Sequence, residues 1–258
     1  MTLVGSIAQA IVQPGEVAVF SLAQAGFCLK TSAGTTLAID PYLTDSVERL
    51  AGFRRLIPAP ITPAALDVDI LAITHNHPDH LDLDALPAWT GMHMRFVAAP
   101  DCAETFRQYG IPEERVTILR AGETYTCRDL SIRAVFADHG ELAPEAVGFV
   151  IETDGMTFYN VGDSGLASER ILPSLPPAID VMIAPINGAY GNLNEGDACR
   201  LAELVRPRWL IGCHTGMFAE HGGDPERFLA LAGALEGITA LVMAPGECRV
   251  FPRGEVRL

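Results

Sequence analysis

The sequence contains 258 residues, of which 49% are hydrophobic and 19% are charged, and its formal net charge is −14 at pH 7. These values are typical of a globular protein that buries a substantial hydrophobic core. The acidic excess repels phosphate backbones, and Arg54-Arg55 is the only pair of adjacent basic residues, so we expect no long nucleic acid as a partner.

The sequence gives no indication of a membrane or secreted protein. No apolar run approaches the roughly 20 residues that cross a bilayer. Residues 1–13 have no basic start of the kind that opens a secretory signal. Six cysteines are scattered without close pairs, which is typical of reduced thiols rather than of a disulfide framework. We therefore expect a cytoplasmic protein.

The first half of the chain is rich in short apolar runs that predict strands. The first three runs are separated by short turns and predict a meander. The expected strands are residues 17–22, 27–31, 35–39, 69–73, 95–99, 116–119, 124–127, 130–136, 147–152 and 156–161.

Helices are expected at three places between these strands. Residues 45–56 carry two apolar positions at helical spacing. Thr62-Pro63 combines a capping threonine with a proline at the first helical position, which predicts a helix start. Asp101 and Glu104 have the spacing of a capping box, so a further helix is expected from Asp101 until shortly before Gly110.

The last third of the chain alternates strands with helices. Strands are expected at residues 181–184, 209–212 and 240–243, with helices beginning after Asn194 and Asp224. A strand-rich half followed by this alternation predicts an α/β fold with two sheets, each covered by helices on one side. There is no sequence repeat or long linker, so residues 1–258 are expected to form one domain.

Four metal-binding side chains crowd together directly after the apolar run at residues 69–73. They are His75, His77, Asp79 and His80, and they include three of the seven histidines in the chain. Ligand sites of open α/β folds lie at the carboxyl ends of strands. Imidazole and carboxylate together suit zinc, manganese or iron. The alternative is a polar loop that is merely rich in histidine, but this crowding favours a metal site.

Three more donors occupy equivalent places later in the chain. His139, Asp163 and His214 each follow an apolar run, as the cluster does. A single histidine at such a place is usually structural. Three donors at equivalent strand ends of one chain favour a shared function, and we expect them to join the cluster.

The ordered set resembles the metal-binding motif of the metallo-β-lactamase superfamily of hydrolases. Its members here are His75-x-His77-x-Asp79-His80, then His139, then Asp163 within Gly-Asp-Ser-Gly, and then His214. The resemblance implies a four-layer αβ/βα sandwich, in agreement with the two-sheet pattern. Residues 48–55, followed by a proline-rich loop, are similar to the L-ascorbate-6-phosphate lactonase branch, although this chain is shorter.

The resemblance also implies roles for individual residues. A metal-bound hydroxide on two divalent ions, Zn or Mn, would attack a small ester, lactone or phosphoester. Asp79 would act either as a ligand alone or also as the catalytic group that passes a proton to the leaving group. Carried over position by position, His75, His77 and His139 would hold the first ion, Asp79, His80 and His214 the second, and Asp163 would bridge them.

Four further residues have open roles. Asp82 is expected to orient a ligand or to cap backbone N–H groups. His221 follows His214 in a loop and would either approach the substrate or face solvent. Arg54 and Arg55 would bind an anionic substrate, since arginine binds phosphate through a planar fork. Their alternative is a solvated helix face that pairs with nearby carboxylates.

Other functions remain open at this point. An iron-dependent oxidoreductase uses the same fold, but 258 residues leave no room for an appended flavin or rhodanese-like domain. A non-catalytic metal-binding scaffold would be favoured by missing donors, whereas all seven positions are filled. The sequence therefore favours a metal-dependent hydrolase with a small-molecule substrate, and it is compatible with an oligomer.

Overall fold

The computed structural model describes residues 2–254, whose strands form two seven-stranded sheets. The first sheet contains β1 (Glu16–Ala23), β2 (Gly26–Thr31), β3 (Thr36–Ile39), β4 (Ile70–Ile73), β5 (Arg95–Ala98), β6 (Val116–Ile118) and β14 (Cys248–Pro252). The second contains β7 (Thr124–Cys127), β8 (Leu130–Phe136), β9 (Val147–Thr153), β10 (Met156–Asn160), β11 (Val181–Pro185), β12 (Trp209–Cys213) and β13 (Thr239–Val242).

Both sheets combine an antiparallel part with a parallel part. In the first, in the order β14-β1-β2-β3-β4-β5-β6, pairing is antiparallel as far as β3 and parallel from β3 to β6. In the second, in the order β13-β12-β11-β10-β9-β8-β7, β10 to β13 are parallel and β7 to β10 are antiparallel. Consequently β4, β8, β10 and β12 all end at the same side of the molecule.

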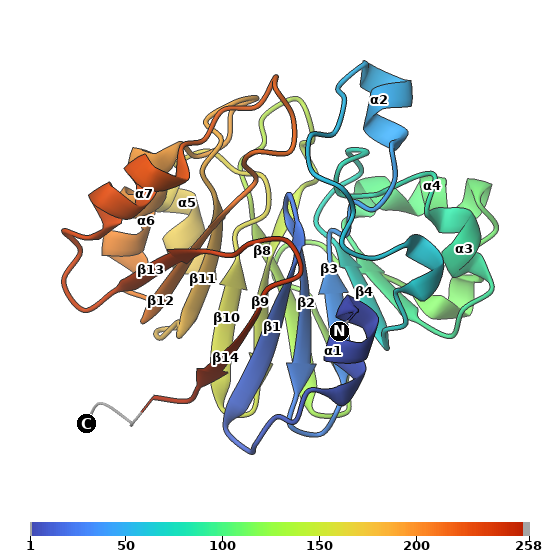
Figure 1. Ribbon diagram of the computed structural model, residues 1–258, viewed down its shortest axis with the longest axis horizontal. Helices are drawn as coiled ribbons and strands as arrows, with labels where there is room; N and C mark the ends of the chain where they lie inside the picture. The colour runs from blue at the N-terminus through green and yellow to red at the C-terminus, as the bar shows by residue number, and fades with distance from the viewer. Residues whose placement is uncertain (1, 255–258) are drawn as a thin grey trace.

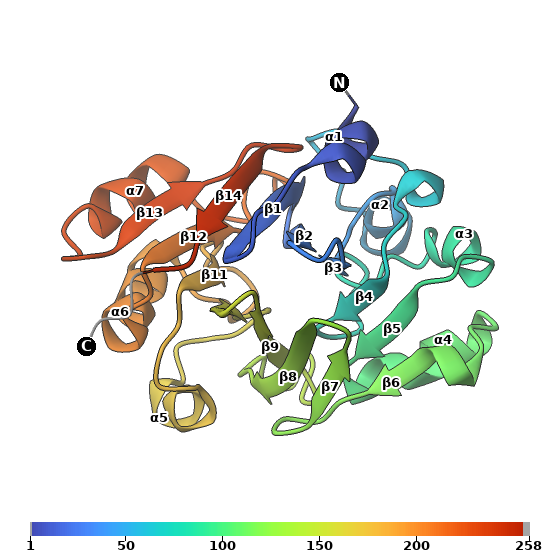
Figure 2. The same ribbon diagram turned by 90° about the horizontal axis from the view of Figure 1, so that it is seen from below.

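The helices cover the outer faces of the two sheets, which face one another (Figure 1 and Figure 2). This arrangement confirms the predicted α/β sandwich. The helices α3 and α4 lie outside the first sheet, α5, α6 and α7 lie outside the second, and α2 stands at the end where β3 and β4 finish. Their bounds are α1 Leu3–Gln9, α2 Ser46–Ala51, α3 Leu86–Thr90, α4 Ala103–Gln108, α5 Ser168–Ile171, α6 Glu195–Val205 and α7 Pro225–Ala232.

The period of two along the central strands explains the layers. Phe149 and Ile151 of β9 belong to a cluster that joins both sheets, whereas Val150 between them packs in a second cluster with residues of α6 and α7. Likewise Phe158 and Tyr159 of β10 belong to these two different clusters. Strands buried on both faces read as continuous apolar runs, which is why the sequence identifies them.

Two helix caps were predicted correctly. The Asn194 side chain accepts a hydrogen bond from Asp197 N–H at the start of α6, with a distance of 3.0 Å. Asp224 Oδ1 accepts hydrogen bonds from Glu226 and Arg227 N–H at the start of α7. Such caps satisfy backbone donors that have no partner inside the helix.

Other helix predictions were wrong in extent or in mechanism. Thr62-Pro63 opens only a 3₁₀ turn, Pro63–Ala65, without a side-chain cap. The helix expected over residues 45–56 is limited to α2, because Gly52 adopts a left-handed conformation with φ of 78°. Asp101 does not cap α4, since its Oδ2 accepts a hydrogen bond from Asn76 N–H instead. The helices α1, α3 and α5 and the strand β14 were not predicted.

No helix among residues 2–254 is long and apolar enough to cross a membrane.

Candidate metal centre

The seven predicted donors meet at the side of the molecule where β4, β8, β10 and β12 end. The two sheets approach closely there, because Val147 N–H of β9 donates to the Thr74 carbonyl after β4, at 3.0 Å. Gly162 makes this approach feasible. Its φ is 67°, and a Cβ at this position would lie 2.8 Å from the Val147 carbonyl oxygen. Only glycine fits such a position without strain.

One group of donors surrounds a point between the two sheets. His214 Nε2 lies 3.3 Å from Asp79 Oδ2 and 3.3 Å from Asp163 Oδ1. His80 Nε2 lies 3.3 Å from His214 Nε2 and 3.3 Å from Asp163 Oδ1. Ligand atoms that share a tetrahedral ion at about 2.0–2.1 Å are roughly 3.3 Å apart. Asp79, His80 and His214, which we call the second set, have two separations of 3.3 Å and one of 3.8 Å, between His80 Nε2 and Asp79 Oδ2, so a small adjustment of Asp79 would let them share one ion.

A neighbouring group, the first set, contains His75, His77 and His139. Their ring nitrogens lie within 4.8 Å of one another. His77 Nδ1 is 3.3 Å from His139 Nε2, while His77 Nε2 contacts the Leu142 carbonyl at 3.2 Å. That carbonyl accepts the Nε2 proton, so Nδ1 is left as the nitrogen able to bind an ion.

Asp163 lies between the two sets. Its Oδ1 faces His80 and His214, and its Oδ2 lies 3.9 Å from His139 Nε2. Asn192 donates a 2.7 Å hydrogen bond to Oδ2 and thereby fixes the orientation of the carboxylate. One carboxylate with an oxygen toward each set is suited to bridge two ions.

Unpartnered buried atoms support the fit of a cation. Across residues 2–254, His75 Nε2 and Asp163 Oδ1 are among the buried polar atoms that have no hydrogen-bond partner. Leaving such an atom without a partner costs about 1–3 kcal/mol, and more for a charged group. A divalent ion would satisfy both atoms, and the donor types are those that zinc and manganese accept.

Asp40 orients His80, a role that was not assigned from the sequence. The fully buried Asp40 carboxylate accepts hydrogen bonds from Thr74 N–H at 2.8 Å, from Thr74 Oγ1–H at 2.6 Å and from His80 Nδ1–H at 2.8 Å. The bond from Nδ1 directs Nε2 of His80 at the second set. Burial alone would lower the pKa of His80, but Asp163 and Asp40 raise it well above its usual range, so an ion would displace the proton on Nε2. Asp40 directly follows β3, so its position carried the same signal as the predicted donors.

Gln24 and Asn192 were also missed. Gln24 Nε2 donates to Asp79 Oδ2 at 3.0 Å and lies 3.3 Å from His214 Nδ1. The backbone reinforces this contact, because His214 N–H donates to the Gln24 carbonyl at 2.9 Å. Gln24 and His214 both have left-handed backbone conformations, with φ of 52° and 59°. Strain of this kind is concentrated at functional sites.

The protonation tendencies of the two sets differ. Burial, and then the adjacent His80, lower the pKa of His75 well below its usual range, and burial also lowers the pKa of His139. Burial alone would lower the pKa of His214, but Asp163 and Asp79 raise this pKa to about 9. His75 and His139 of the first set therefore favour the neutral imidazole, whereas an ion at the second set would displace a proton from His214.

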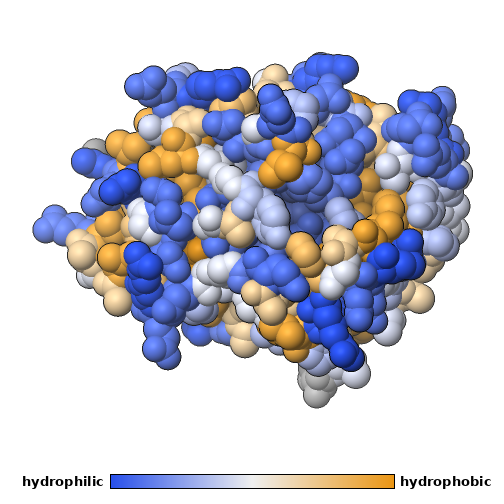
Figure 3. All heavy atoms as spheres, turned by 90° about the horizontal axis from the view of Figure 1, so that it is seen from above, coloured by the Kyte–Doolittle hydropathy of each residue, from blue (hydrophilic) through white to orange (hydrophobic). Residues whose placement is uncertain are grey.

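A pocket of about 220 Å³ opens over the two sets and is lined by Asp79, Asp163, His214 and His221, among others. Figure 3 looks onto this end of the molecule, where hydrophobic side chains lie in patches between hydrophilic ones. His221 stacks on His214, with ring centroids 5.0 Å apart and an interplanar angle of 15°. Of its two expected roles, the structure therefore supports the one at the substrate pocket.

The structure does not support Arg54 and Arg55 as substrate-binding residues, since neither lines the pocket. Arg54 is exposed. Arg55 donates to the carbonyls of Ile57 and Thr44, at 2.9 and 2.7 Å, and its guanidinium lies 4.8 Å from the Tyr42 ring centroid. Its charge is used to fix the loop that follows α2.

Asp82 caps backbone groups, one of its two expected roles. Its Oδ2 accepts hydrogen bonds from Leu43 and Thr44 N–H, both at 2.8 Å. These bonds attach the loop after β3 to the histidine-rich loop after β4.

Comparison with known families agrees with this geometry. A model of the β-lactamase superfamily domain matches residues 19–214, a span from β1 to the last predicted donor. The chain belongs to the metallo-β-lactamase superfamily. The matched span contains all seven predicted metal-binding residues.

Individual relatives are similar over most of their length. A metal-dependent hydrolase from Cupriavidus taiwanensis is 29% identical, over 90% of this chain and 86% of its own. A probable L-ascorbate-6-phosphate lactonase from Escherichia fergusonii is 25% identical, over 87% of this chain and 77% of its own. Among solved structures, the metallo hydrolase Igni18 from Ignicoccus hospitalis has a TM-score of 0.75 and 23% identity, covering 92% of this chain and 98% of its own. That structural match shows a shared fold.

Proposed function

We propose that this chain is a binuclear metal-dependent hydrolase that uses two divalent ions, zinc or manganese, to cleave a small ester, lactone or phosphoester. The observation that carries the proposal is the position of Asp163, with Oδ1 facing the second set and Oδ2 facing His139 of the first set. The names of the relatives, metal-dependent hydrolase and probable lactonase, support the reaction type.

The side chains have separate roles in this proposal. His75, His77 and His139 hold the first ion, Asp79, His80 and His214 hold the second, and Asp163 bridges them. When bound, two such ions lower the pKa of a water towards neutrality and polarise the scissile oxygen. Asp40 and Asn192 orient ligands, because their hydrogen bonds fix His80 and Asp163.

Asp79 has a second proposed role in proton transfer. Burial alone would raise the pKa of Asp79, but His80 and His214 hold it below its usual range, so the carboxylate would first accept a proton from the attacking water and then pass it to the leaving group. The Asp79 side chain lines the pocket and is 13% exposed, the largest exposed fraction among the carboxylates of the cluster. Gln24 fixes its Oδ2 by a 3.0 Å hydrogen bond. The carboxylate is therefore both oriented and accessible to a bound molecule, as proton transfer requires.

We also propose a cytoplasmic location. All six cysteines are free, and four of them are buried. Free buried thiols are typical of proteins in reducing compartments, where disulfides are rare.

Metal binding is the first test. Calorimetric titration of chelator-treated protein with Zn²⁺ or Mn²⁺ should give two sites per chain, and chelation should abolish hydrolysis. The double variant His75→Ala/His77→Ala should lose the first site. His93→Ala is the matched control, because His93 is exposed and lies beside Asp67, away from the pocket. If the double variant and the wild-type protein bind the same number of ions, the proposed ligands are wrong.

Substrate screening is the second test. Lactones, esters, thioesters, phosphodiesters and β-lactams should be offered to the Zn²⁺-loaded and Mn²⁺-loaded protein. Hydrolysis of at least one class, lost in Asp163→Ala, would support the proposal. Redox-active iron in protein purified without added metal, together with no hydrolysis in the whole screen, would favour the oxidoreductase alternative.

A further inference from the structure

The pocket above the metal centre has an aromatic wall formed by Phe53, Tyr190 and Phe218. The ring centroid of Phe53 lies 6.2 Å from that of Tyr190 and 6.3 Å from that of Phe218. Separations of this size are typical of interacting aromatic pairs. The three residues come from separate loops, after α2, β11 and β12, so the wall is assembled by the fold rather than by one local sequence.

Apolar side chains continue to the rim of the pocket. Leu142 and Tyr190 both line it, yet they are 56% and 47% exposed. Val47 and Ala51 of α2 add aliphatic surface on another side. Exposed apolar side chains around a concave site with a few polar groups at its base are typical of a small-molecule site.

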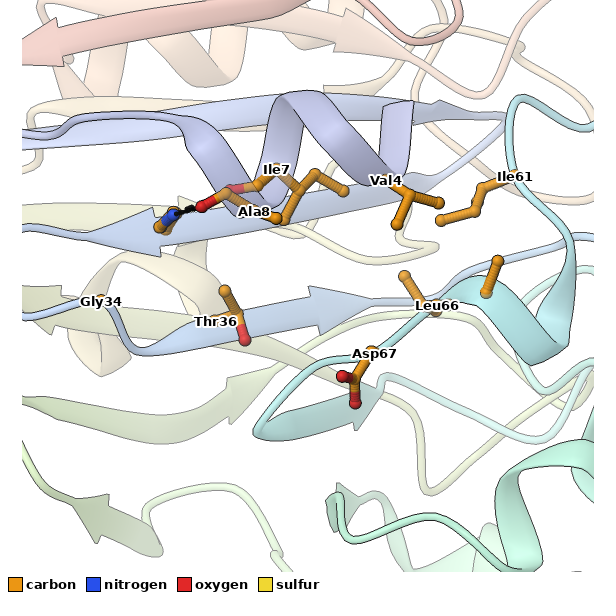
Figure 4. A pocket seen from close by; sticks show the side chains of 10 residues that line it. Val4, Ile7, Ala8, Gly34, Thr36, Ile61, Leu66 and Asp67 are labelled. Atoms are coloured by element: carbon orange, nitrogen blue, oxygen red, sulfur yellow. Dashed lines mark hydrogen bonds between the residues drawn. The ribbon is translucent and has the colours of Figure 1, made fainter. Parts of the chain in front are cut away.

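No lysine or arginine among residues 2–254 faces this wall or lines the pocket. Arg55 is held by the carbonyls of Thr44 and Ile57. Lys30 is the only lysine of the sequence, and it donates to the carbonyls of Ile7 and Ala8 at the end of α1, beside a different cavity (Figure 4).

The absence of lysine and arginine from the described pocket lining limits the charge that a substrate can carry there. A phosphate or carboxylate tail bound away from the metal ions would need charged hydrogen bonds, which arginine or lysine normally supplies. An uncharged aromatic or branched aliphatic group would instead bury apolar area against Phe53, Tyr190 and Leu142. Burying such a group is favourable by about 25 cal/mol per Å².

We propose that the substrate carries an uncharged, apolar group, aromatic or aliphatic, next to the scissile ester or lactone bond. This inference rests on the proposed hydrolase function and names the substrate class of that same site. The apolar group contacts the wall of Phe53 and Tyr190 and the rim at Leu142, while the scissile bond lies above Asp79 and Asp163. It replaces the anionic substrate that Arg54 and Arg55 suggested.

Binding of hydroxamates tests the inference without turnover, because a hydroxamate group binds zinc whatever its tail. Affinities for the Zn²⁺-loaded protein should be measured by calorimetry for acetohydroxamate, octanohydroxamate, 3-phenylpropanohydroxamate and a hydroxamate with a phosphonate tail. We expect the octyl and phenyl compounds to bind at least about tenfold more tightly than acetohydroxamate. The phosphonate compound should gain nothing over acetohydroxamate.

Three variants connect this preference to the wall. Phe53→Ala should remove most of the gain for the phenyl compound, measured as the ratio of its affinity to that of acetohydroxamate in the same variant. Leu142→Arg should raise affinity for the phosphonate compound, and because Leu142 is exposed this change is compatible with folding. Leu204→Arg is the matched control, since Leu204 is 53% exposed on α6 and does not line the pocket.

The outcomes separate this inference from the proposed reaction. Tightest binding of the phosphonate compound by the wild-type protein, or an unchanged preference in both Phe53→Ala and Leu142→Arg, would overturn the inference. If the apolar preference is found but phenyl-substituted lactones and esters are not cleaved, the pocket assignment stands and the proposed reaction fails. Cleavage with a preference for phosphorylated substrates would leave the reaction standing and overturn the inference.

Discussion

The metal centre and the aromatic wall lie on the same side of the molecule but are built differently. His75, His80 and His214 are almost completely buried. His75 and His214 lie within two residues of a strand end, and His80 is held by its hydrogen bond to the buried Asp40. Phe53 and Tyr190 also lie in loops, but both are partly exposed. In the proposed function, the buried groups would hold the metal ions, while the more exposed loop residues would contact the substrate. Loops on a rigid scaffold commonly carry specificity in this way.

Asp163→Ala should have the largest effect and tests the role of the buried metal centre. One positioned acid or base contributes about 10²–10⁴-fold to the rate. Because the Asp163 carboxylate faces both sets of ligands, its removal should lower kcat/KM by more than this. Steady-state kinetics at saturating metal should show the loss, and circular dichroism should show a folded protein.

Asp180→Ala is the control for that variant. Asp180 immediately precedes β11 of the second sheet and lies beside the opposite end of β10, where it accepts a hydrogen bond from Thr157 N–H at 2.9 Å. We expect a cost in stability with nearly unchanged turnover. Equal turnover of Asp163→Ala and Asp180→Ala would remove Asp163 from the active site.

A smaller loss is expected for Asp79→Asn. The amide keeps the shape of the side chain but cannot transfer a proton as a carboxyl does, so turnover should fall by about 10²-fold or more. The first set does not contain Asp79 and should still bind an ion, which calorimetry would show. Normal turnover in this variant would leave the proton-transfer role without support.

A smaller effect, on metal affinity, is expected for Asp40→Asn. If the amide donates to His80 Nδ1, it favours the tautomer that carries a proton on Nε2, the nitrogen that should bind the ion. Affinity of the second site should fall by about 10–100-fold, the usual effect of losing such a partner. Competition with a fluorescent zinc chelator would measure it.

Asp69→Asn is a close control for Asp40→Asn. Asp69 Oδ2 accepts hydrogen bonds from the backbone N–H and the hydroxyl of Thr36, as Asp40 does from Thr74, but it lies at the opposite end of β4. We expect unchanged metal affinity in Asp69→Asn. A similar loss in both variants would indicate a general effect on folding rather than an effect on His80.

The seven donors could be predicted because their signal is local. Each follows an apolar run, and strands buried on both faces produce such runs reliably. Asp40 gave the same signal after β3 and could have been found by the same rule. Gln24 and Asn192 lie in turns with ordinary turn composition, so only the folded chain brings them to Asp79 and Asp163.

Two local signals of the sequence meet competition from distant partners in the folded chain. Asp101 has the spacing of a capping box, but Asn76 N–H in the histidine-rich loop takes its carboxylate. Arg55 has the chemistry of an anion-binding residue, but Thr44 and Ile57 take its donors. The strand β14 gave little signal, because Phe251 is its only buried residue.

The smallest effects should come from variants of Arg54 and Arg55. They separate the contribution of these residues to loop stability from any contribution to substrate binding. Arg55→Ala removes two hydrogen bonds from a charged donor and the contact with Tyr42. The free energy of unfolding should therefore fall by about 1–3 kcal/mol. Arg54 is exposed and pairs with no carboxylate within residues 2–254, so Arg54→Ala should change it by no more than about 0.5 kcal/mol. Urea denaturation of both variants would measure these values.

Neither variant should change the ratio of kcat/KM between charged and neutral substrates, because neither side chain lines the pocket. A selective loss for charged substrates in Arg54→Ala would return this residue to the binding site and argue against an uncharged substrate.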